Sequence, residues 1–464
     1  MCEVKEVNMN KFIGDKAFYK HLFAVAGPLI LQQLITTSVQ LVDNVMVGKL
    51  GEEAIGAVSV VNQLYFIVIL ITFGALGGAG VFSAQYYGSK DYDKLKQSFR
   101  FKLLIGFIIA CLSFVLFSIF GRSLIMIFTD KEYTIDLAMT YLKYAKWSAF
   151  PWIISVAIAN TFRETGVTKP LLIISIIAIL TNTLLNYTFI FGHFGSPALG
   201  VEGAAIATSI ARVIEFILMT ILLIKKGQVF NTKLVDIFKI DKKLFISILI
   251  MALPLLLNEA LWSTGQTVFL HAYSRRGGQA LAAMNITSAI SQIVFVTFGA
   301  IATAVAVLVG NTLGQNQLEK AKDNARKLIA TAVMVAVVAG FILFALSFFI
   351  LNIYDVSEAT KDIAKFNIRI NALFIPIYSF NVTLYFTMRA GGDTKSTLLM
   401  DAGYMWVIPV PVAIVLSYLT QMPVTLMFLF INMLDIPKML FGLSRYRKEN
   451  WIRNLAKEDE LSAI

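Results

Sequence analysis

The sequence has little cysteine, little histidine and no nucleotide-binding loop, and each shortage excludes a kind of chemistry. Its two cysteines, Cys2 and Cys111, cannot build a disulfide framework or a thiolate metal site within one chain. Its three histidines are scattered and form no ligand cluster. No Walker loop with a following Lys-Ser/Thr is present, so we expect no ATP hydrolysis, no metal and no bound cofactor.

Charge is scarce as well. Charged residues make up 15% of the 464 residues and hydrophobic residues 57%, whereas an ordinary soluble domain carries about 25% charged residues. The net charge of +11 would suggest nucleic acid as the partner of a soluble protein, but here the basic residues lie in gaps between long apolar runs. We therefore expect a lipid bilayer around the chain and no nucleic-acid partner.

The apolar runs are long enough to cross a membrane, for which a helix needs about 20 residues. Only helices are plausible, because lipid offers no hydrogen bonds to an exposed backbone. We predict an all-α polytopic membrane protein with 12 transmembrane helices, at roughly residues 17–46, 54–87, 93–120, 134–162, 169–191, 200–224, 244–272, 279–310, 325–352, 358–388, 395–418 and 422–445.

Lysine and arginine concentrate in the gaps that share one side of this topology. These gaps are residues 90–102, 225–243, 320–327 and 445–453. The positive-inside rule assigns that side to the cytoplasm. We therefore expect a multi-pass protein of the plasma membrane with both termini cytoplasmic, and a first apolar segment that serves as a signal-anchor.

The two halves of the chain are repeats at an offset of 226 residues. Pro28 falls on Pro254, Gln40 falls on Gln266, and the motif that begins at Arg163 (Arg-x-x-Gly-x-Thr-Lys) falls on the one that begins at Arg389. Six spans per half give both halves the same orientation, so they are parallel repeats. We predict pseudo-symmetric six-helix bundles, with a cleft between them for substrate. The predicted boundaries are 1–226 for the N-lobe, 227–243 for a cytoplasmic linker, 244–445 for the C-lobe and 446–464 for a cytoplasmic tail.

Ionisable residues inside membrane segments are costly and usually functional. Asp43 lies in the first segment, in Gln40-Leu-Val-Asp43-Asn44. It is either a carboxylate near the outer end of a helix that reaches water, or one that loads a proton or a monovalent cation on one side and releases it on the other. We favour the second interpretation.

Three neutral residues extend this pattern. Asn182 and Asn186 are four residues apart and share a helix face, and Thr208 follows in Gly203-Ala-Ala-Ile-Ala-Thr208. Amide and hydroxyl oxygens suit a hard cation such as Na⁺. The alternative, hydrogen bonds between helices and nothing more, stays open.

The C-terminal half carries its own polar positions. Glu259 follows Pro254, which can bend the helix, and Asn285 begins a polar stripe with Ser288 and Gln292 that can simply wet a cavity. Two further acids have basic neighbours, because Asp401 lies near Arg389 and Lys395, and Asp435 precedes Lys438 by three residues, the spacing of an intrahelical pair. Arg212 and Glu215 read as a structural pair at the same spacing.

Together these motifs resemble the multidrug and toxic compound extrusion (MATE) transporters over nearly the whole length. The matching stretches are Pro28 through Val42-Asp43-Asn44-Val45-Met46-Val47-Gly48, Gly80-x-x-x-x-Ala84-Gln85-Tyr86-Tyr87-Gly88, the Arg163 motif, Asn182-Thr-Leu-Leu-Asn186, and Gly200-Val-Glu-Gly203 through Thr208. The resemblance implies a V-shaped pair of six-helix lobes, alternating access, and antiport of small organic cations or drugs against H⁺ or Na⁺.

The same resemblance suggests residue roles. Asp43 matches the first-helix aspartate of the family's N-lobe cation site, and Asn182, Asn186 and Thr208 match its other members. Position 186 is often aspartate in the family, so its asparagine here lowers the negative charge of the site and leaves H⁺ and Na⁺ both open. Glu259 resembles the seventh-helix acid of a C-lobe cation site.

That C-lobe site is incomplete, because residues 366–388 contain neither Asp nor Glu where the family has a second acid. We therefore assign the coupling to the N-lobe and assign Glu259, Gln40, Gln266, Asn285 and Asp435 to substrate binding. Aromatic side chains that line the cleft would attract organic cations. We expect the protein to act as a monomer.

Two other functions were weighed. A lipid-linked precursor flippase of the same superfamily would need intramembrane cations to hold phosphates, and only Arg212 and Arg369 were identified as such. An intramembrane enzyme would need clustered catalytic residues, whereas the acids here are dispersed over several helices. We therefore expect a transporter and not an enzyme.

Overall fold

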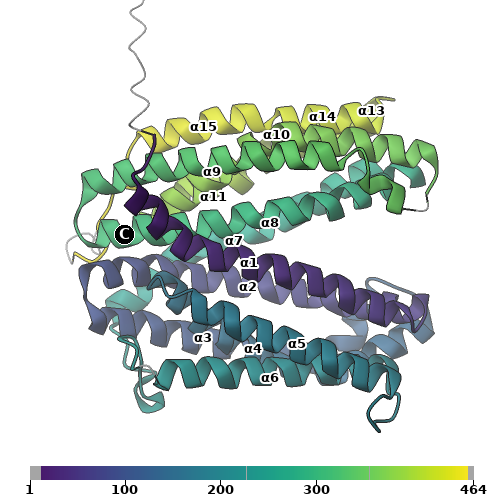
Figure 1. The fold of residues 1–464 in the computed structure, drawn as a ribbon, viewed down its shortest axis with the longest axis horizontal. Coiled ribbons are helices and arrows are strands. Elements are labelled where there is room, and N and C mark those ends of the chain that lie inside the picture. The colour runs from purple at the N-terminus through teal and green to yellow at the C-terminus, as the bar shows by residue number, and fades with distance from the viewer. Residues whose placement is uncertain (1–11, 226, 355, 458–464) are drawn as a thin grey trace, which may run out of the picture. The chain divides into compact units, whose positions relative to one another are not determined.

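A computed structural model describes residues 12–225, 227–354 and 356–457 of the chain (Figure 1). Within these ranges the secondary structure is helical and contains no strand, so the predicted all-α class is confirmed. The first half forms α1 Lys16–Gly48, α2 Glu52–Ser89, α3 Tyr92–Met126, α4 Glu132–Glu164, α5 Lys169–Phe191 and α6 Gly200–Lys225. Residues 458–464 of the expected tail lie outside the described residues.

The second half begins with four long helices and ends with two interrupted ones. The long helices are α7 Lys242–Ser274, α8 Gly278–Gly314, α9 Leu318–Leu346 and α10 Glu358–Ala390. The single helix expected at 395–418 is divided into α11 Thr394–Leu398, the π-helix η4 Leu399–Gly403, α12 Tyr404–Val407 and α13 Pro409–Leu419. The one expected at 422–445 is divided into α14 Val424–Met433 and α15 Asp435–Arg447.

The described helices include 11 that are long and apolar enough to cross a membrane. The count of 12 is therefore not confirmed. The exception is α4, which has the length of a span, 33 residues, but carries Lys143 and Lys146 inside it and Arg163 and Glu164 at its end. These charges shorten its uninterrupted apolar stretch.

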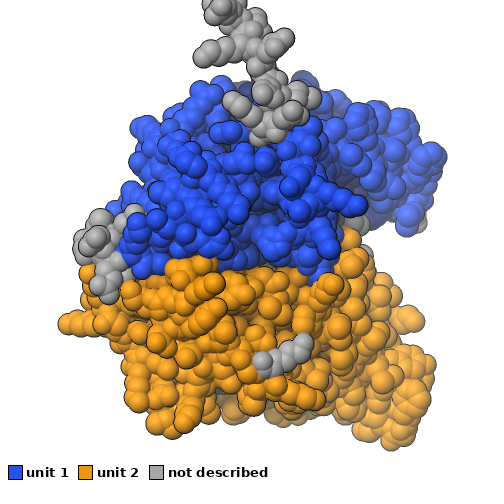
Figure 2. Space-filling model, turned by 60° about the vertical axis from the view of Figure 1, so that its left-hand side comes forward, with its two compact units in different colours: residues 1–30, 257–463 blue, residues 31–256, 464 orange. Residues whose placement is uncertain are grey.

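The chain divides into two compact units whose boundaries differ from those of the repeats (Figure 2). Among the described residues, unit 1 comprises 12–30 and 257–457, and unit 2 comprises those between 31 and 256. The helices α1 and α7 are thus each shared between the units. The expected lobes at 1–226 and 244–445 follow the sequence repeat, whereas the units follow the packing.

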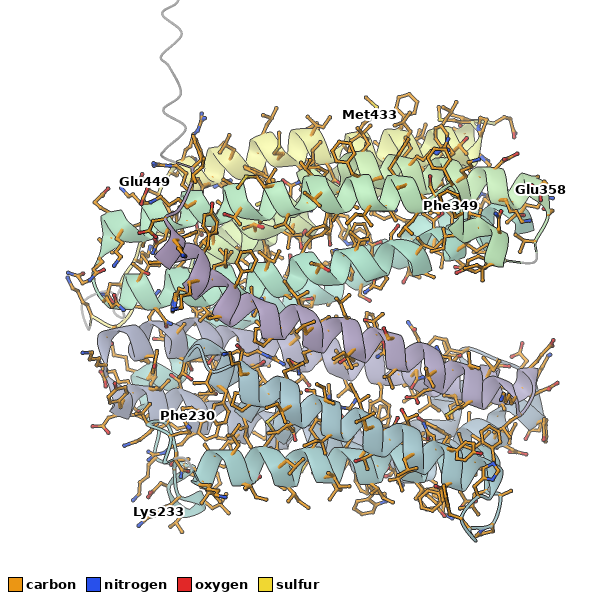
Figure 3. The ribbon with its side chains drawn as sticks, viewed as in Figure 1. Phe230, Lys233, Phe349, Glu358, Met433 and Glu449 are labelled. Atoms are coloured by element: carbon orange, nitrogen blue, oxygen red, sulfur yellow. The ribbon has the colours of Figure 1, made fainter. Side chains whose placement is uncertain are left out.

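The first half of α1 packs in the core of unit 1. Leu22, Val25 and Ala26 are buried there in one cluster with Ala304 and Val305 of α8. Within unit 1, the labelled residues Glu449 and Glu358 lie at opposite ends of the helices (Figure 3).

The core of unit 2 lies among α2, α3, α4 and α6, and the first half of α7 packs against α2. A methyl group added at Gly78 would come within 2.7 Å of the backbone of Ala252. Small residues at such crossings let two membrane helices approach closely. Close packing matters there because, in lipid, no hydrophobic effect drives the helices together.

The segment between α6 and α7 is held on unit 2. Phe230 is fully buried and contacts Phe99 and Phe162 with ring centroids 5.1 and 5.0 Å away. Arg100 on α3 donates to the Thr232 hydroxyl over 2.7 Å. Figure 3 labels Phe230 and Lys233 in this segment.

Candidate functional site

The cation-site residues predicted from the sequence lie together in unit 2. Asp43 comes from the second half of α1, Asn182 and Asn186 come from α5, and Thr208 comes from α6. The Nδ2 of Asn186 donates to the Oδ1 of Asp43 over 2.9 Å and to the Oδ1 of Asn182 over 3.4 Å. The Nδ2 of Asn182 donates in turn to the hydroxyl of Thr208 over 3.4 Å. A continuous chain of hydrogen bonds thus joins three helices.

The close approach of α5 and α6 depends on Gly203. A Cβ atom at this position would lie 2.5 Å from the carbonyl oxygen of Phe189, closer than real Cβ atoms come. Since backbone blocks the space, any side chain at Gly203 would push the helices apart. We expect this close approach to help hold Asn182 of α5 near Thr208 of α6.

Asp43, Asn186 and Thr208 border a cavity of about 460 Å³ within unit 2, a volume in the range of small-molecule sites, and Asn182 lies behind them, bonded to Asn186 and Thr208. From α1 it is lined by Gln40, Asp43, Asn44 and Val47, whose spacing places them on one helix face. The other lining residues are Val58, Asn62, Tyr65, Phe66, Ile69, Tyr141, Ala145, Ser148, Trp152, Asn186, Ala204, Thr208 and Arg212. The wall therefore combines one carboxylate, several neutral polar groups and four aromatic rings.

Arg212 on this wall is already paired. Its Nη1 donates to the Oε2 of Glu215 over 2.8 Å, as the three-residue spacing predicts. Its charge is thus neutralised by a neighbour on its own helix. The half-buried Asp43 keeps hydrogen-bonding capacity for another ligand, because among the described residues its side chain accepts from a neutral amide alone.

Asn186 adds an oxygen that no protein group uses. The residue is only 2% exposed, and its Oδ1 has no hydrogen-bond partner among the described residues. An unpaired buried amide oxygen costs roughly 1–3 kcal/mol. A proton on Asp43 or a bound cation would give the Asn186 oxygen a partner. The geometry therefore suits a site that binds and releases a cation.

The residues assigned to substrate binding do not form one group. Gln40 lines the unit 2 cavity. In unit 1, Gln266 and Asn285 are exposed, Glu259 is half-buried on α7, and Asp435 begins α15. Across the part of the chain that the structure describes, no hydrogen bond or ion pair joins these four to one another. Their role in binding stays a prediction.

A second polar cluster lies in unit 1, around Asp401. The Nζ of Lys438 lies 2.7 Å from its Oδ1, and the Nδ2 of Asn258 donates to its Oδ2 over 3.1 Å. The expected pairing of Lys438 with Asp435 was wrong. Lys438 instead reaches a different helix, because Asp401 lies beside it in space although it is 37 residues away in sequence.

Sequence reasoning missed a buried ion pair in unit 2. Lys102 was counted among the cytoplasmic basic residues, but its side chain is 0% exposed and pairs with Glu164, which is 12% exposed. Lys102 also donates to the Thr161 hydroxyl over 3.1 Å. Gly80 makes room, since a Cβ there would lie 2.6 Å from a Glu164 oxygen. The partner is 62 residues away, so no local signal marked the pair.

Comparison with known proteins places the chain in a family. The family model described as MatE matches residues 28–188 and 254–432, two stretches whose starts are 226 residues apart like the internal repeat. The chain is 26% identical over 401 residues to the "Probable multidrug resistance protein YoeA" of Bacillus subtilis, an alignment that covers 86% of each chain. It is 25% identical over 408 residues to the "Multidrug resistance protein MdtK" of Yersinia enterocolitica, covering 87% of this chain and 88% of the relative.

Solved structures have the same fold. A crystal structure titled as MATE in complex with MaL6 superposes with a TM-score of 0.86 at 18% identity, over 98% of this chain and 99% of that one. A structure titled as the outward-facing conformation of a multidrug resistance MATE family transporter superposes with a TM-score of 0.84 at 20% identity, over 94% and 97%. The resemblance read from the sequence motifs is thus confirmed, and this multi-pass membrane protein belongs to the MATE family.

Proposed function

We propose that the protein is a secondary active antiporter that exports amphipathic organic cations or drugs in exchange for H⁺ or Na⁺ by alternating access. Asp43 is the carboxylate that couples the two movements. The observation that carries the proposal is the pairing of Asp43 with Asn186, whose own oxygen is left over in a polar cavity. The names of the curated relatives, multidrug resistance proteins, support the export of drugs.

The wall of the unit 2 cavity has groups that suit either a small inorganic cation or an organic cation. A small cation would be held by the Asp43 carboxylate and the free oxygen of Asn186, with Asn182 and Thr208 holding Asn186 in place. An organic cation would use the same carboxylate together with aromatic faces such as those of Tyr65 and Trp152. Because one negative charge serves both, the two cargoes compete.

Competition of this kind is what antiport requires. A ligand shifts a conformational equilibrium only by its difference in affinity for the two states. If the small cation is held more tightly in one state and the organic cation in the other, each drives the release of the other. The single carboxylate, with asparagine at position 186, leaves H⁺ and Na⁺ both as coupling ions.

The remaining assignments follow the same proposal. For substrate binding we propose Gln40 in the unit 2 cavity and, in unit 1, Glu259, Gln266, Asn285 and Asp435. The protein works as a monomer in the plasma membrane with both termini in the cytoplasm, as the distribution of basic residues suggests.

A lipid-linked precursor flippase is not favoured by the arrangement of cations. Such a protein needs unneutralised positive charge to hold phosphates. Lys102, Arg212 and Lys438 each form an ion pair with a carboxylate, and Arg369 donates to the Ser347 hydroxyl and lies over the rings of Phe344 and Phe348. A binding assay with a lipid pyrophosphate would detect the alternative.

The proposal is tested by drug accumulation in cells. Cells that express the wild-type protein are expected to hold less ethidium than cells with an empty vector, and Asp43→Asn is expected to remove the difference. Glu53→Gln, which removes an exposed acid in the first turn of α2, is the matched control and should behave as the wild type. Equal accumulation in the wild-type and Asp43→Asn cells would contradict the proposal.

A further inference from the structure

Both carboxylate oxygens of Asp401, in the polar cluster of unit 1, have hydrogen-bond partners. Lys438 takes one carboxylate oxygen of Asp401 at 2.7 Å and Asn258 takes the other at 3.1 Å. The side chains of Lys438 and Asp401 are only 17% and 21% exposed. A buried carboxylate without a cation would be costly, whereas a hydrogen-bonded pair offsets much of that cost.

The backbone holds this cluster in place. Asp401 lies in the π-helix Leu399–Gly403, a departure from α-helical geometry that often accompanies functional sites. The Oδ1 of Asn258 accepts a hydrogen bond from the backbone N–H of Ala402 over 3.2 Å. Asn258 therefore forms hydrogen bonds with both the side chain of Asp401 and the backbone of Ala402, and these bonds hold the carboxylate in position.

The internal repeat shows how the cluster differs from its counterpart in unit 2. At the offset of 226 residues, Asn258 corresponds to Gln32 and Asp401 corresponds to Ser175. The structure makes the same bond there, because the Nε2 of Gln32 lies 2.6 Å from the hydroxyl of Ser175. Unit 1 thus has a carboxylate where unit 2 has a neutral hydroxyl. At the same offset Lys438 falls on Arg212, so both units carry a cation here, but Lys438 pairs with Asp401 whereas Arg212 pairs with Glu215.

The Asp43 site shows the opposite arrangement. There the carboxylate receives a neutral amide, an oxygen of Asn186 is unpaired, and the nearby Arg212 is committed to Glu215. One acid site is open to a free cation, and the other is closed by a cation on the protein's own side chain.

We propose that the ammonium of Lys438 is a tethered monovalent cation, which fills at Asp401 a site that would otherwise take Na⁺ or a proton. Unit 1 then binds no free cation at this position. Removal of the ammonium uncovers the site, with the Asp401 carboxylate as its charged ligand and the vacated space of the lysine chain as its volume. The proposal that Lys438 occupies the site at Asp401 is independent of the role of Asp43. The consequence that the transporter couples only through unit 2 rests on the proposed function.

Other charged and titratable groups surround Asp401 and must be kept constant. They are Lys438 and Asp435 on α15, Glu259 on α7, Arg389, Tyr378 and Tyr385 on α10, and Tyr404 on α12. The test therefore alters Lys438 and Asp401 in a protein that carries Asp43→Asn throughout, and it compares that protein with and without each change.

The experiment measures thermal unfolding of the purified full-length protein, in NaCl or in choline chloride at equal ionic strength and across about pH 5 to 9. All variants carry Asp43→Asn, which removes any response from unit 2. With Lys438→Gln added, we expect Na⁺ or low pH to raise the melting temperature by at least about 3 °C more than in Asp43→Asn alone. With Asp401→Asn also added, the response should disappear.

The outcomes separate the two proposals. An identical response in Asp43→Asn with and without Lys438→Gln overturns the tethered cation, as does a response that survives Asp401→Asn. If the Lys438→Gln protein folds only in Na⁺ or at low pH, that rescue is the expected response; failure to fold under every condition overturns the proposal. Failure of the Asp43 proposal appears elsewhere, as drug export that persists in the Asp43→Asn protein with Lys438 intact.

Discussion

The amide of Asn186 donates to the carboxylate of Asp43 over 2.9 Å, and its own Oδ1 has no partner among the described residues. The amide nitrogen of Asn186 thus binds the carboxylate of Asp43, while its amide oxygen remains available as an acceptor. A protonated Asp43 can donate to that acceptor, and a cation can bridge the two oxygens. The pair has two arrangements available, which is the property that a coupling site needs.

A second carboxylate at this position should favour Na⁺. Asn186→Asp replaces the neutral amide next to Asp43, so the site gains negative charge and we expect stronger binding of Na⁺. The measurement is the Na⁺ dependence of the melting temperature, which should become larger than in the wild type. Asn62→Asp adds the same charge to the same cavity, at a position with no bond to Asp43. An equal Na⁺ response in both variants would show that the Asp43–Asn186 geometry has no special role.

The close packing at Gly203 should matter more than its size suggests. In Gly203→Ala the new methyl group meets the carbonyl of Phe189 at 2.5 Å, so α5 and α6 must separate. We expect a loss of about 1–3 kcal/mol in unfolding free energy and reduced drug export, because Thr208 moves away from Asn182. Gly56→Ala is the control, since its nearest neighbour would be 3.6 Å away. Equal stability and export in the two variants would contradict this prediction.

Aromatic contact should contribute to the affinity for organic cations. Trp152→Ala removes a ring from the wall of the unit 2 cavity, and we expect the dissociation constant of ethidium to rise about 2- to 30-fold, as for a loss of about 0.5–2 kcal/mol. Fluorescence titration of the purified protein measures it. Trp147→Ala, on the same helix but 58% exposed and packed on Phe114, should leave the affinity unchanged. If both substitutions weaken binding equally, the cavity is not where the cation binds.

The buried pair Lys102–Glu164 should behave as a unit. Lys102→Met leaves a buried carboxylate without its partner, and we expect a loss of about 3–5 kcal/mol in unfolding free energy. Adding Glu164→Gln should restore a large part of it, because no uncompensated charge remains. Arg122→Met breaks the pairs of Arg122 with Glu132 and Asp136, whose side chains are all exposed, and should leave stability near the wild-type value. Additive losses in the Lys102/Glu164 double variant would exclude coupling between the two residues.

The sequence was sufficient for the all-α class, which follows from apolar length, and it indicated the repeat through a constant offset. The group of Asp43 with Asn182, Asn186 and Thr208 came from the resemblance to the MATE family, because the four-residue spacing relates only Asn182 and Asn186 to each other. The sequence was insufficient where the partner is distant in sequence, as for Lys102 with Glu164 and for Lys438 with Asp401.

Two other features also lay beyond local signals. The interruption of the helix at 399–403 depends on tertiary contacts with Asn258, which apolar length does not reveal. The sharing of α1 and α7 between units likewise arises from packing, so the repeat boundary did not mark it.

The most direct test of the coupling role is transport in sealed vesicles that contain the purified protein. A pH gradient and a Na⁺ gradient are imposed separately, and the movement of a fluorescent organic cation is followed for the wild type, Asp43→Asn and Glu53→Gln. We expect at least one gradient to drive the wild type and Glu53→Gln, and neither gradient to drive Asp43→Asn above the rate without a gradient. Gradient-driven transport by Asp43→Asn at the wild-type rate would contradict the assignment of Asp43 as the coupling carboxylate.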